Sequence, residues 1–373
     1  MRDNINILHI SPYFNYVCGV SKYVYLLLRG LKELSINCIP KINLYFITNG
    51  GDALLRFNSL GIKPHIIDFK KGMANLFYLI SNTFQLEEYC LSNNIDIIHS
   101  HHRYPELISN IIKKRIFKKT GKKIKTITTV HSIVNGYRSI SFQSDKIIAV
   151  SKTVRKNLIN NYNVSEEIII QFYNPVDKSN NYEKKRINRS NLEIDDQSKI
   201  ILFVGRYSEE KGVDVLIKAF LEVSKVYALY LLMITDAKDN IKRKILSKSD
   251  KIIFIKPCDD ITMYYEISDI VVVPSLIESC PFVVLEAGIN KKLLIASNVV
   301  GISESLEDGK HAVLFDAGNK KTLIEAIQKA LNMSEIQKQQ LAENLHDKVN
   351  TFFDYKIYAE KLYKIYLSML NDS

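Results

Sequence analysis

Short apolar runs alternate with longer amphipathic segments along nearly the whole chain, and this alternation restricts the fold more than any other feature. The first run, residues 5–10, is followed by a segment in which Tyr23, Leu27, Leu31 and Leu34 recur with the period of a helix. Alternation of strands and helices favours a parallel sheet that is covered on both faces. Because the series occurs twice, we expect an α/β protein with two doubly wound domains.

The runs predicted to be strands are short and rich in Ile, Leu and Val. In the first half they are residues 5–10, 44–48, 65–68, 95–99, 124–130, 146–150 and 168–172. In the second half they are residues 200–204, 229–234, 252–255, 270–273, 293–296 and 312–315. Three predicted helices, residues 320–332, 334–349 and 352–367, close the chain.

The chain has 373 residues, more than one hydrophobic core usually supports. A polar stretch that is poor in apolar residues runs from Asp177 to Asn191 and is typical of a linker. We therefore expect an N-terminal domain over 1–178, a linker over 179–198, a C-terminal domain over 199–351 and a final helix over 352–373.

Cysteine content and hydropathy indicate the compartment. The five cysteines are odd in number and form no C-x-x-C pair, which favours a reducing cytoplasm and argues against a zinc site. No apolar stretch approaches the length of a membrane helix. Residues 1–10 lack the apolar core of a signal peptide and are expected to form the first strand.

Two glutamates flank a predicted helix start in the second half. Glu278 lies in the loop after the strand 270–273, and Glu286 follows eight positions later, inside a helix that begins near Pro281. The N–H groups at a helix start favour an anion or a sugar hydroxyl. A carboxylate on each side of that start suits a sugar nucleotide, one for sugar hydroxyls and one for the ribose.

Two cations follow the strand 200–204. Arg206 and Lys211 flank a strand-to-helix turn, which is where open α/β sheets bind ligands. As plain surface charges they would lie at the positive end of a helix dipole, which is mildly unfavourable. A diphosphate explains both better, because Arg offers a fork of donors and Lys a point charge.

Together the two segments resemble the retaining glycosyltransferases of family 4, which have the GT-B fold. The shared pattern is strand-G-R-x-x-x-x-K-G and, about seventy residues later, E-x7-E before a helix. Both motifs in this order are a specific combination, and the resemblance covers nearly the whole chain. It implies two Rossmann-like domains facing a cleft, with the helix over 352–373 crossing back to the N-terminal domain.

The resemblance also implies the reaction. We expect a hexosyltransferase that takes a sugar from a nucleotide-diphospho-sugar with retention of configuration, with a UDP-sugar favoured over a GDP-sugar. No metal or other cofactor is expected, and no D-x-D triplet, the metal-diphosphate motif of the other main glycosyltransferase fold, occurs. The residues that the resemblance places at the donor are Gly19, Arg206, Lys211, Glu278, Ser279, Cys280, Pro281, Phe282, Val283 and Glu286.

Histidines follow two of the predicted strands in the first half. His131 comes directly after the strand 124–130, and the resemblance makes it a catalytic contact to the donor sugar beside Arg206, Lys211 and Glu278. His101 and His102 follow the strand 95–99 and are expected on the acceptor side. No carboxylate or cysteine completes a metal set with them, so we predict no metal site.

The acceptor is expected to be a glycan or a lipid-linked glycan in cell-surface polysaccharide biosynthesis, such as capsule or lipopolysaccharide, by analogy only. The net charge is +11, and eight basic residues without an acid lie between Lys113 and Lys125. Two interpretations are open. This stretch is the solvated face of a helix, or it attaches a cytoplasmic enzyme to the anionic inner face of the plasma membrane.

Two other classes of function remain as alternatives. A GT-B-fold epimerase or phosphorylase would act on related substrates, but the E-x7-E pattern argues against both. A non-catalytic nucleic-acid-binding protein would need aromatic residues among its basic ones. Only Phe117 lies within 113–125, so this alternative is remote and no nucleic-acid partner is expected.

Overall fold

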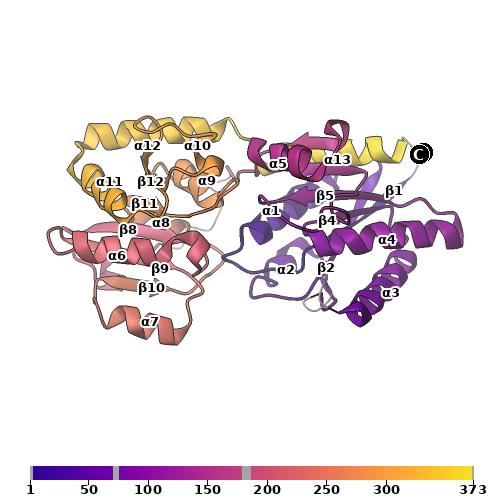
Figure 1. Ribbon diagram of the computed structural model, residues 1–373, viewed down its shortest axis with the longest axis horizontal. Helices are drawn as coiled ribbons and strands as arrows, with labels where there is room; N and C mark the ends of the chain where they lie inside the picture. The colour runs from indigo at the N-terminus through magenta and orange to yellow at the C-terminus, as the bar shows by residue number, and fades with distance from the viewer. Residues whose placement is uncertain (1–2, 70–74, 179–185, 372–373) are drawn as a thin grey trace. The chain divides into compact units, whose positions relative to one another are not determined.

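The computed structural model describes residues 3–69, 75–178 and 186–371. The chain divides into two compact units, one made of Met1–Asp177 with Phe353–Ser373 and the other of Lys178–Phe352. Figure 1 shows a sheet flanked by helices in each unit. The α/β fold class and the two doubly wound domains predicted from the sequence are confirmed.

The first unit is built on a parallel sheet. Its strands are β1 (Asn4–Ile10), β2 (Lys41–Thr48), β3 (His65–Ile66), β4 (Ile97–Ser100), β5 (Lys125–Val130), β6 (Lys146–Ala149) and β7 (Ile169–Gln171). Their order across the sheet is β3-β2-β1-β4-β5-β6-β7. The helices are α1 (Gly19–Leu34), α2 (Arg56–Leu60), α3 (Leu76–Ser92), α4 (Arg103–Thr120), α5 (Lys152–Tyr162) and α13 (Tyr355–Asn371).

The strands of this sheet are largely buried on both faces because helices cover both sides. On one face, Leu8 of β1 and Ile98 of β4 join a buried cluster with Ile108, Ile112 and Ile116 of α4. The three isoleucines recur every four residues and form a single stripe along the helix. Their spacing therefore fixes which side of α4 faces the sheet.

The last helix, α13, packs on α1 within the first unit. A Cβ added to Gly30 of α1 would lie 2.7 Å from Cβ of Ala359, so the two helices touch through their backbones. The Tyr23 and Tyr358 hydroxyls are 2.7 Å apart, and the Tyr355 hydroxyl donates to Glu33 at 2.9 Å. The chain therefore ends in the unit in which it began.

The second unit contains another parallel sheet. Its strands are β8 (Lys199–Val204), β9 (Leu229–Ile234), β10 (Ile252–Ile255), β11 (Ile270–Val273), β12 (Leu293–Ser297) and β13 (Val313–Phe315). Their order is β10-β9-β8-β11-β12-β13. The helices are α6 (Val213–Val223), α7 (Asp239–Leu246), α8 (Thr262–Ile267), α9 (Phe282–Ile289), α10 (Val300–Ser303), α11 (Lys320–Asn332) and α12 (Glu335–Asn350).

In both sheets the first strand lies in the interior. Successive strands are added first on one side of it and then on the other, so the strand order reverses once. In the first unit β2 lies on one side of β1 and β4 on the other, and β9 and β11 flank β8 in the same way. At such a reversal the loops after the two neighbouring strands diverge and leave a crevice outside the carboxyl ends of the strands. Each unit therefore has one such place where a ligand is expected.

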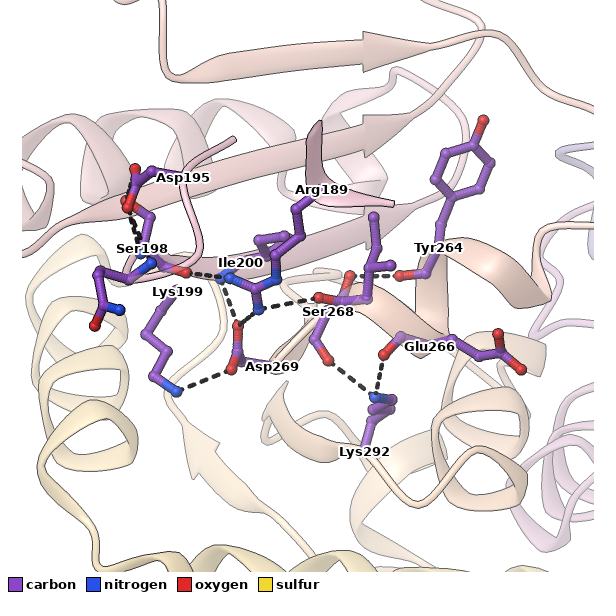
Figure 2. A network of polar contacts seen from close by, with 12 residues as sticks. Arg189, Asp195, Ser198, Lys199, Ile200, Tyr264, Glu266, Ser268, Asp269 and Lys292 are labelled. Atoms are coloured by element: carbon purple, nitrogen blue, oxygen red, sulfur yellow. Dashed lines mark hydrogen bonds and ion pairs between the residues drawn. The ribbon is translucent and has the colours of Figure 1, made fainter. Parts of the chain in front are cut away.

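The residues just before β8 differ from the linker predicted over 179–198. Residues 179–185 lie outside the described residues, whereas residues 186–198 are part of the second unit. Arg189 reaches into the amino edge of the sheet (Figure 2), where it donates to the carbonyl oxygens of Ser198 and Ile267 and to Asp269 Oδ2 at 3.0 Å. Residues 186–198 are polar, as a linker would be, but polar groups such as Arg189 bind the edge of the sheet.

Asp269 is the centre of this network. It accepts hydrogen bonds from Arg189, from Lys199 Nζ at 3.1 Å and from the backbone N–H of Ile200 at 2.9 Å (Figure 2). Lys292 lies close by and donates to the carbonyl oxygens of Glu266 and Ser268, both at 3.0 Å. The start of β8 is thus tied to the start of β11.

We predict that Asp269→Ala lowers the free energy of unfolding of the second unit by about 2–4 kcal/mol, because a buried N–H and two cations lose their acceptor. Urea unfolding measures this change. The control is Glu222→Ala, which removes an exposed ion pair with Lys320 (2.9 Å) and should have little effect. An equally small loss for both variants would contradict a central role for Asp269.

Candidate active site

The second unit brings two loops together at the carboxyl ends of β8 and β11. Gly212 ends the loop after β8 with φ +64°, and a Cβ there would lie 1.9 Å from the carbonyl oxygen of Pro274. The N–H of Leu276 donates to the carbonyl oxygen of Glu210 at 2.7 Å. Only glycine allows this approach, and the approach sets the positions of the charged residues in both loops.

Lys211 and Glu278 meet where these two loops touch. Lys211 Nζ lies 2.5 Å from Glu278 Oε1, and the hydroxyl of Ser275 donates to the same oxygen at 2.8 Å. The side chains are mostly buried, with exposed fractions of 24% for Lys211 and 10% for Glu278. The structure therefore joins one residue from each of the two sequence motifs into an ion pair.

Arg206 lies in the same loop as Lys211 but is directed to a different partner. Its side chain is about half exposed, and Nη2 lies 3.5 Å from Glu210 Oε2. An exposed pair of this kind contributes little to stability and is easily exchanged for another anion. Arg206 is therefore the more exposed cation of this loop, and Lys211 is the more buried one.

Glu286 lies on α9, the helix predicted to begin near Pro281. Pro281 is the N-cap, with extended backbone and no side-chain hydrogen bond to the first turn of the helix. The hydroxyl of Tyr265, a fully buried residue of α8, donates to Glu286 Oε2 at 2.5 Å. Burial, and next the Glu286 carboxylate, raise the pKa of Tyr265 well above its usual value, so this hydroxyl stays a donor.

Three buried hydroxyls near these loops have no hydrogen-bond partner among the described residues. They belong to Ser208 after β8, Thr235 after β9 and Ser279 after β11. Thr235 and Ser279 are 1% and 4% exposed, so water does not reach them freely. Buried hydroxyls are seldom left unpaired, and three of them after neighbouring strands indicate a place that is completed by a ligand.

The other residues predicted at the donor lie around the start of α9. Phe282 is buried, whereas Cys280 and Val283 are partly exposed. A Cβ on Gly301 of α10 would lie 2.1 Å from the carbonyl oxygen of Glu278, so α10 supports this loop from behind. The structure therefore collects the predicted donor residues of the second unit at one edge of its sheet.

The first unit places Gly19 and His131 at the corresponding edge of its own sheet. Gly19 is exposed and is the first residue of α1, whose N-cap, Cys18, makes no side-chain hydrogen bond to the helix. His131 follows β5, and its ring packs edge-on against Tyr23 at 4.7 Å between centroids. Burial lowers the pKa of His131 to about 3, so the ring is neutral.

His101 and His102 do not share one environment. His102 is exposed and is the N-cap of α4. His101 is 2% exposed, and its ring nitrogens face His9 and His131 at 3.2 and 3.4 Å. His101 therefore lies inside the fold and not on an acceptor surface, because β4 ends between β1 and β5. The acceptor-side role remains a prediction for His102 alone.

Three buried histidines, His9, His99 and His101, each bring one ring nitrogen within 4.8 Å of the others. His9 was not recognised from the sequence, since a single histidine inside an apolar strand carries no pattern. His99 uses both of its nitrogens, at 2.6 Å to the Tyr366 hydroxyl and 2.7 Å to Thr129. The cluster is therefore a network of hydrogen bonds between neutral side chains.

Comparison with known proteins identifies the family. The model described as "Glycosyltransferase Family 4" matches residues 17–180, and the model described as "Glycosyl transferases group 1" matches residues 184–348. The chain belongs to the family 4 glycosyltransferases of GT-B fold. One match falls on each unit, and each includes the site residues predicted in that unit.

Relatives and solved structures agree with this assignment. An uncharacterized glycosyltransferase of Methanocaldococcus jannaschii is 27% identical over 91% of this chain and 92% of that protein. A capsular polysaccharide biosynthesis glycosyltransferase of Staphylococcus aureus is 25% identical over 62% of this chain and 64% of its own. The structure of Anabaena HepE in complex with UDP-glucose has a TM-score of 0.78 at 14% identity, covering 98% of this chain and all of that one.

In the described part of this glycosyltransferase, no helix is both long and apolar enough to cross a bilayer.

We predict that Gly212→Ala disrupts the site of this glycosyltransferase, because the new Cβ would overlap the carbonyl of Pro274. Thermal unfolding should show a loss well beyond the ~1–2 kcal/mol expected for left-handed backbone alone. Gly309→Ala is the matched control, since Gly309 has φ +69° and no atom within 4 Å of an added Cβ. Equal losses for the two variants would mean that contact with Pro274 is unimportant.

Proposed function

We propose that this glycosyltransferase transfers a sugar with retention of configuration from a nucleotide-diphospho-sugar, without a metal ion, to a glycan or lipid-linked acceptor. The observation that carries the proposal is the Lys211–Glu278 pair, 2.5 Å apart at the reversal of strand order in the second unit. A cation and a carboxylate side by side match a donor that presents an anionic diphosphate next to sugar hydroxyls.

The diphosphate would bind to Lys211 and Arg206. Both follow β8, and α9 begins on the neighbouring loop, where its N-cap Pro281 makes no side-chain hydrogen bond to the first turn. Together they supply the positive charge that stabilises a departing diphosphate, a task that a metal ion performs in other transferases. The exposed pair between Arg206 and Glu210 would open to admit the phosphate.

Two carboxylates would hold the remainder of the donor. Glu278 already accepts two hydrogen bonds at Oε1, from Lys211 and Ser275, which leaves Oε2 for a sugar hydroxyl. Glu286 is oriented by Tyr265 and would accept from the ribose. Ser208, Thr235 and Ser279 would turn their unpaired hydroxyls to the ligand. We favour a UDP-sugar, in line with the UDP-glucose complex of HepE.

Retention follows in this proposal from attack on the face that the phosphate leaves. The acceptor oxygen forms its bond to the anomeric carbon while the bond to the diphosphate breaks, and the acceptor proton passes to the departing phosphate oxygen. The two-step alternative would need a carboxylate nucleophile, and we assign Glu278, the carboxylate nearest to Lys211, to a sugar hydroxyl instead. Lys211 and Arg206 would stabilise the charge that develops on the leaving group.

We place this reaction in cell-surface polysaccharide biosynthesis, on the cytoplasmic side of the membrane. The similarity to a capsular polysaccharide enzyme supports this assignment. His102, exposed at the start of α4 in the first unit, is our candidate for an acceptor contact.

We predict that Lys211→Ala lowers kcat by about 10²–10³-fold. The variant should stay folded at the assay temperature with a lower thermal midpoint, because the largely buried Glu278 loses its cation. The assay incubates the protein with UDP- and GDP-sugars and oligosaccharide acceptors in EDTA, and NMR follows the anomeric proton of the product. The control is Lys218→Ala, an exposed lysine of α6 in the same unit. Inverted product, dependence on metal, or unchanged kcat in Lys211→Ala would each contradict the mechanism. Conversion of donor without acceptor would indicate an epimerase.

We further propose that helices α3 and α4 of the first unit attach the enzyme to an anionic membrane. The basic stretch from Lys113 to Lys125 is partly neutralised, because Lys113 pairs with Asp145, and Arg115 and Lys119 both pair with Glu87 of α3. Lys114 and Lys118 remain exposed on α4. Charge alone would therefore give only weak attachment.

Helix α3 supplies apolar surface next to these charges. Its large exposed apolar side chains fall within about 100° of one another around the helix axis. They are Leu76, Phe77, Ile80, Phe84 and Leu91. The guanidinium of Arg115 lies 4.8 Å above the ring of Phe84, and Figure 1 shows α3 and α4 side by side. An apolar stripe bordered by basic side chains fits the boundary between anionic headgroups and acyl chains.

We predict that Phe77→Ser with Phe84→Ser abolishes co-sedimentation with phosphatidylglycerol vesicles, which the wild type should bind in a salt-dependent way. Ile336→Ser with Ile357→Ser is the control, because both isoleucines are exposed on other helices. Vesicles of phosphatidylcholine should bind neither form. Undiminished binding by the α3 variant would remove α3 from the membrane surface.

A further inference from the structure

Three histidines of the first unit form a continuous chain of hydrogen bonds that ends at His131. His9 Nδ1 lies 3.2 Å from His101 Nε2, and His101 Nδ1 lies 3.4 Å from His131 Nε2. The three residues come from β1, from the end of β4 and from the end of β5, which are adjacent in the sheet. We infer that His9 and His101 are positioning residues that hold His131 as the neutral tautomer with its proton on Nδ1.

The direction of the chain follows from the atom at its inner end. His9 is fully buried, and its Nε2 has no hydrogen-bond partner among the described residues. A buried N–H without an acceptor is rarer in proteins than an under-used acceptor, so this nitrogen carries the lone pair. The single proton of neutral His9 is then on Nδ1.

The two hydrogen bonds then determine the tautomers of His101 and His131 in turn. His9 Nδ1–H donates to His101 Nε2, which must be bare, so the proton of His101 is on Nδ1. His101 Nδ1–H in turn donates to Nε2 of His131. His131 therefore keeps its proton on Nδ1, at the end of the ring that does not face His101.

The surroundings keep all three rings neutral. Burial lowers the pKa of His9 and His131 to about 3, and burial and the neighbouring histidines lower that of His101 well below its usual value. Tyr23, which contacts His101 and His131 with its ring edge, is itself uncharged, since burial raises its pKa to about 12. A proton added to any one ring would break the sequence of donors and acceptors.

The rings are also held against rotation. His99 is fixed by Tyr366 and Thr129 and stacks on His101 with centroids 4.4 Å apart. Binding of a metal by His9, His99 and His101 would require His99 to give up one of these two short bonds. Rotation of a ring would break the chain, so the packing stabilises one orientation of His131.

This inference rests on the proposed function in one respect, which is that His131 faces the substrates. A neutral ring with Nδ1–H offers one hydrogen-bond donor to a substrate oxygen, such as a sugar hydroxyl or carbonyl. It cannot act as a cationic acid at neutral pH. His131 would thus bind and orient a substrate oxygen that accepts its hydrogen bond. His9 would affect turnover without touching the substrate.

The test is ¹⁵N NMR of the full-length protein labelled at histidine, at pH 7, with His131 assigned by the signals lost in His131→Asn. We expect a protonated Nδ1 and a bare Nε2 for His131 in the wild type. A protonated Nε2, or averaged shifts for the two nitrogens, would overturn the inference without any further variant. This measurement does not depend on finding the donor, so its failure is distinct from failure of the transferase assignment.

Two variants test the role of His9. His9→Phe keeps a ring but removes the donor, and should give mixed tautomers at His131 with about a tenfold lower kcat and little change in KM. His9→Asn places an amide donor near the position of Nδ1 and should restore both the single tautomer and most of kcat. His311→Gln in the second unit is the control. A single unchanged tautomer in His9→Phe would overturn the role of His9.

Discussion

Every strand pair in both sheets is parallel, and this constraint determines where chemistry can occur in the molecule. Parallel strands bring all of their carboxyl ends to one edge, and the reversal of strand order opens that edge between β1 and β4 and between β8 and β11. Buried strands have few positions for polar groups, so charged and hydroxyl side chains gather just beyond them. In the second unit, Gly212 approaches the carbonyl oxygen of Pro274 closely, so the loops after β8 and β11 touch at this edge.

The carboxyl edges of the two sheets differ in electrostatic character, one ionic and the other neutral. In the second unit, Lys211 pairs with Glu278, and Arg206 pairs with Glu210, so the edge carries ionic groups. In the first unit, burial keeps the histidines neutral, and they act through the direction of their hydrogen bonds. In the proposed reaction, the ionic edge would suit the anionic diphosphate, and the neutral edge would suit an uncharged substrate oxygen.

The strands could be predicted from the sequence to within a few residues, because buried parallel strands are continuous apolar runs between polar turns. The positions of Lys211 and Glu278 could also be predicted, since two motifs mark them. The partners Tyr265, Thr235 and His9 could not, because their roles depend on strand order, which local patterns do not contain. The bond of Arg189, within the predicted linker, to Asp269 could not be predicted either, because composition does not show the partner of a polar residue.

The Lys211–Glu278 pair links the two halves of the expected donor. With both side chains largely buried, each compensates the charge of the other, and removal of either leaves a desolvated charge behind. In the proposed reaction, a diphosphate that attracts Lys211 would loosen its hold on Glu278 Oε1 and make that carboxylate a better acceptor for a sugar hydroxyl. Binding of phosphate and binding of sugar should then support one another, whereas a free nucleotide gains only the first. This coupling would favour the proposed intact donor over the product diphosphate at the same site.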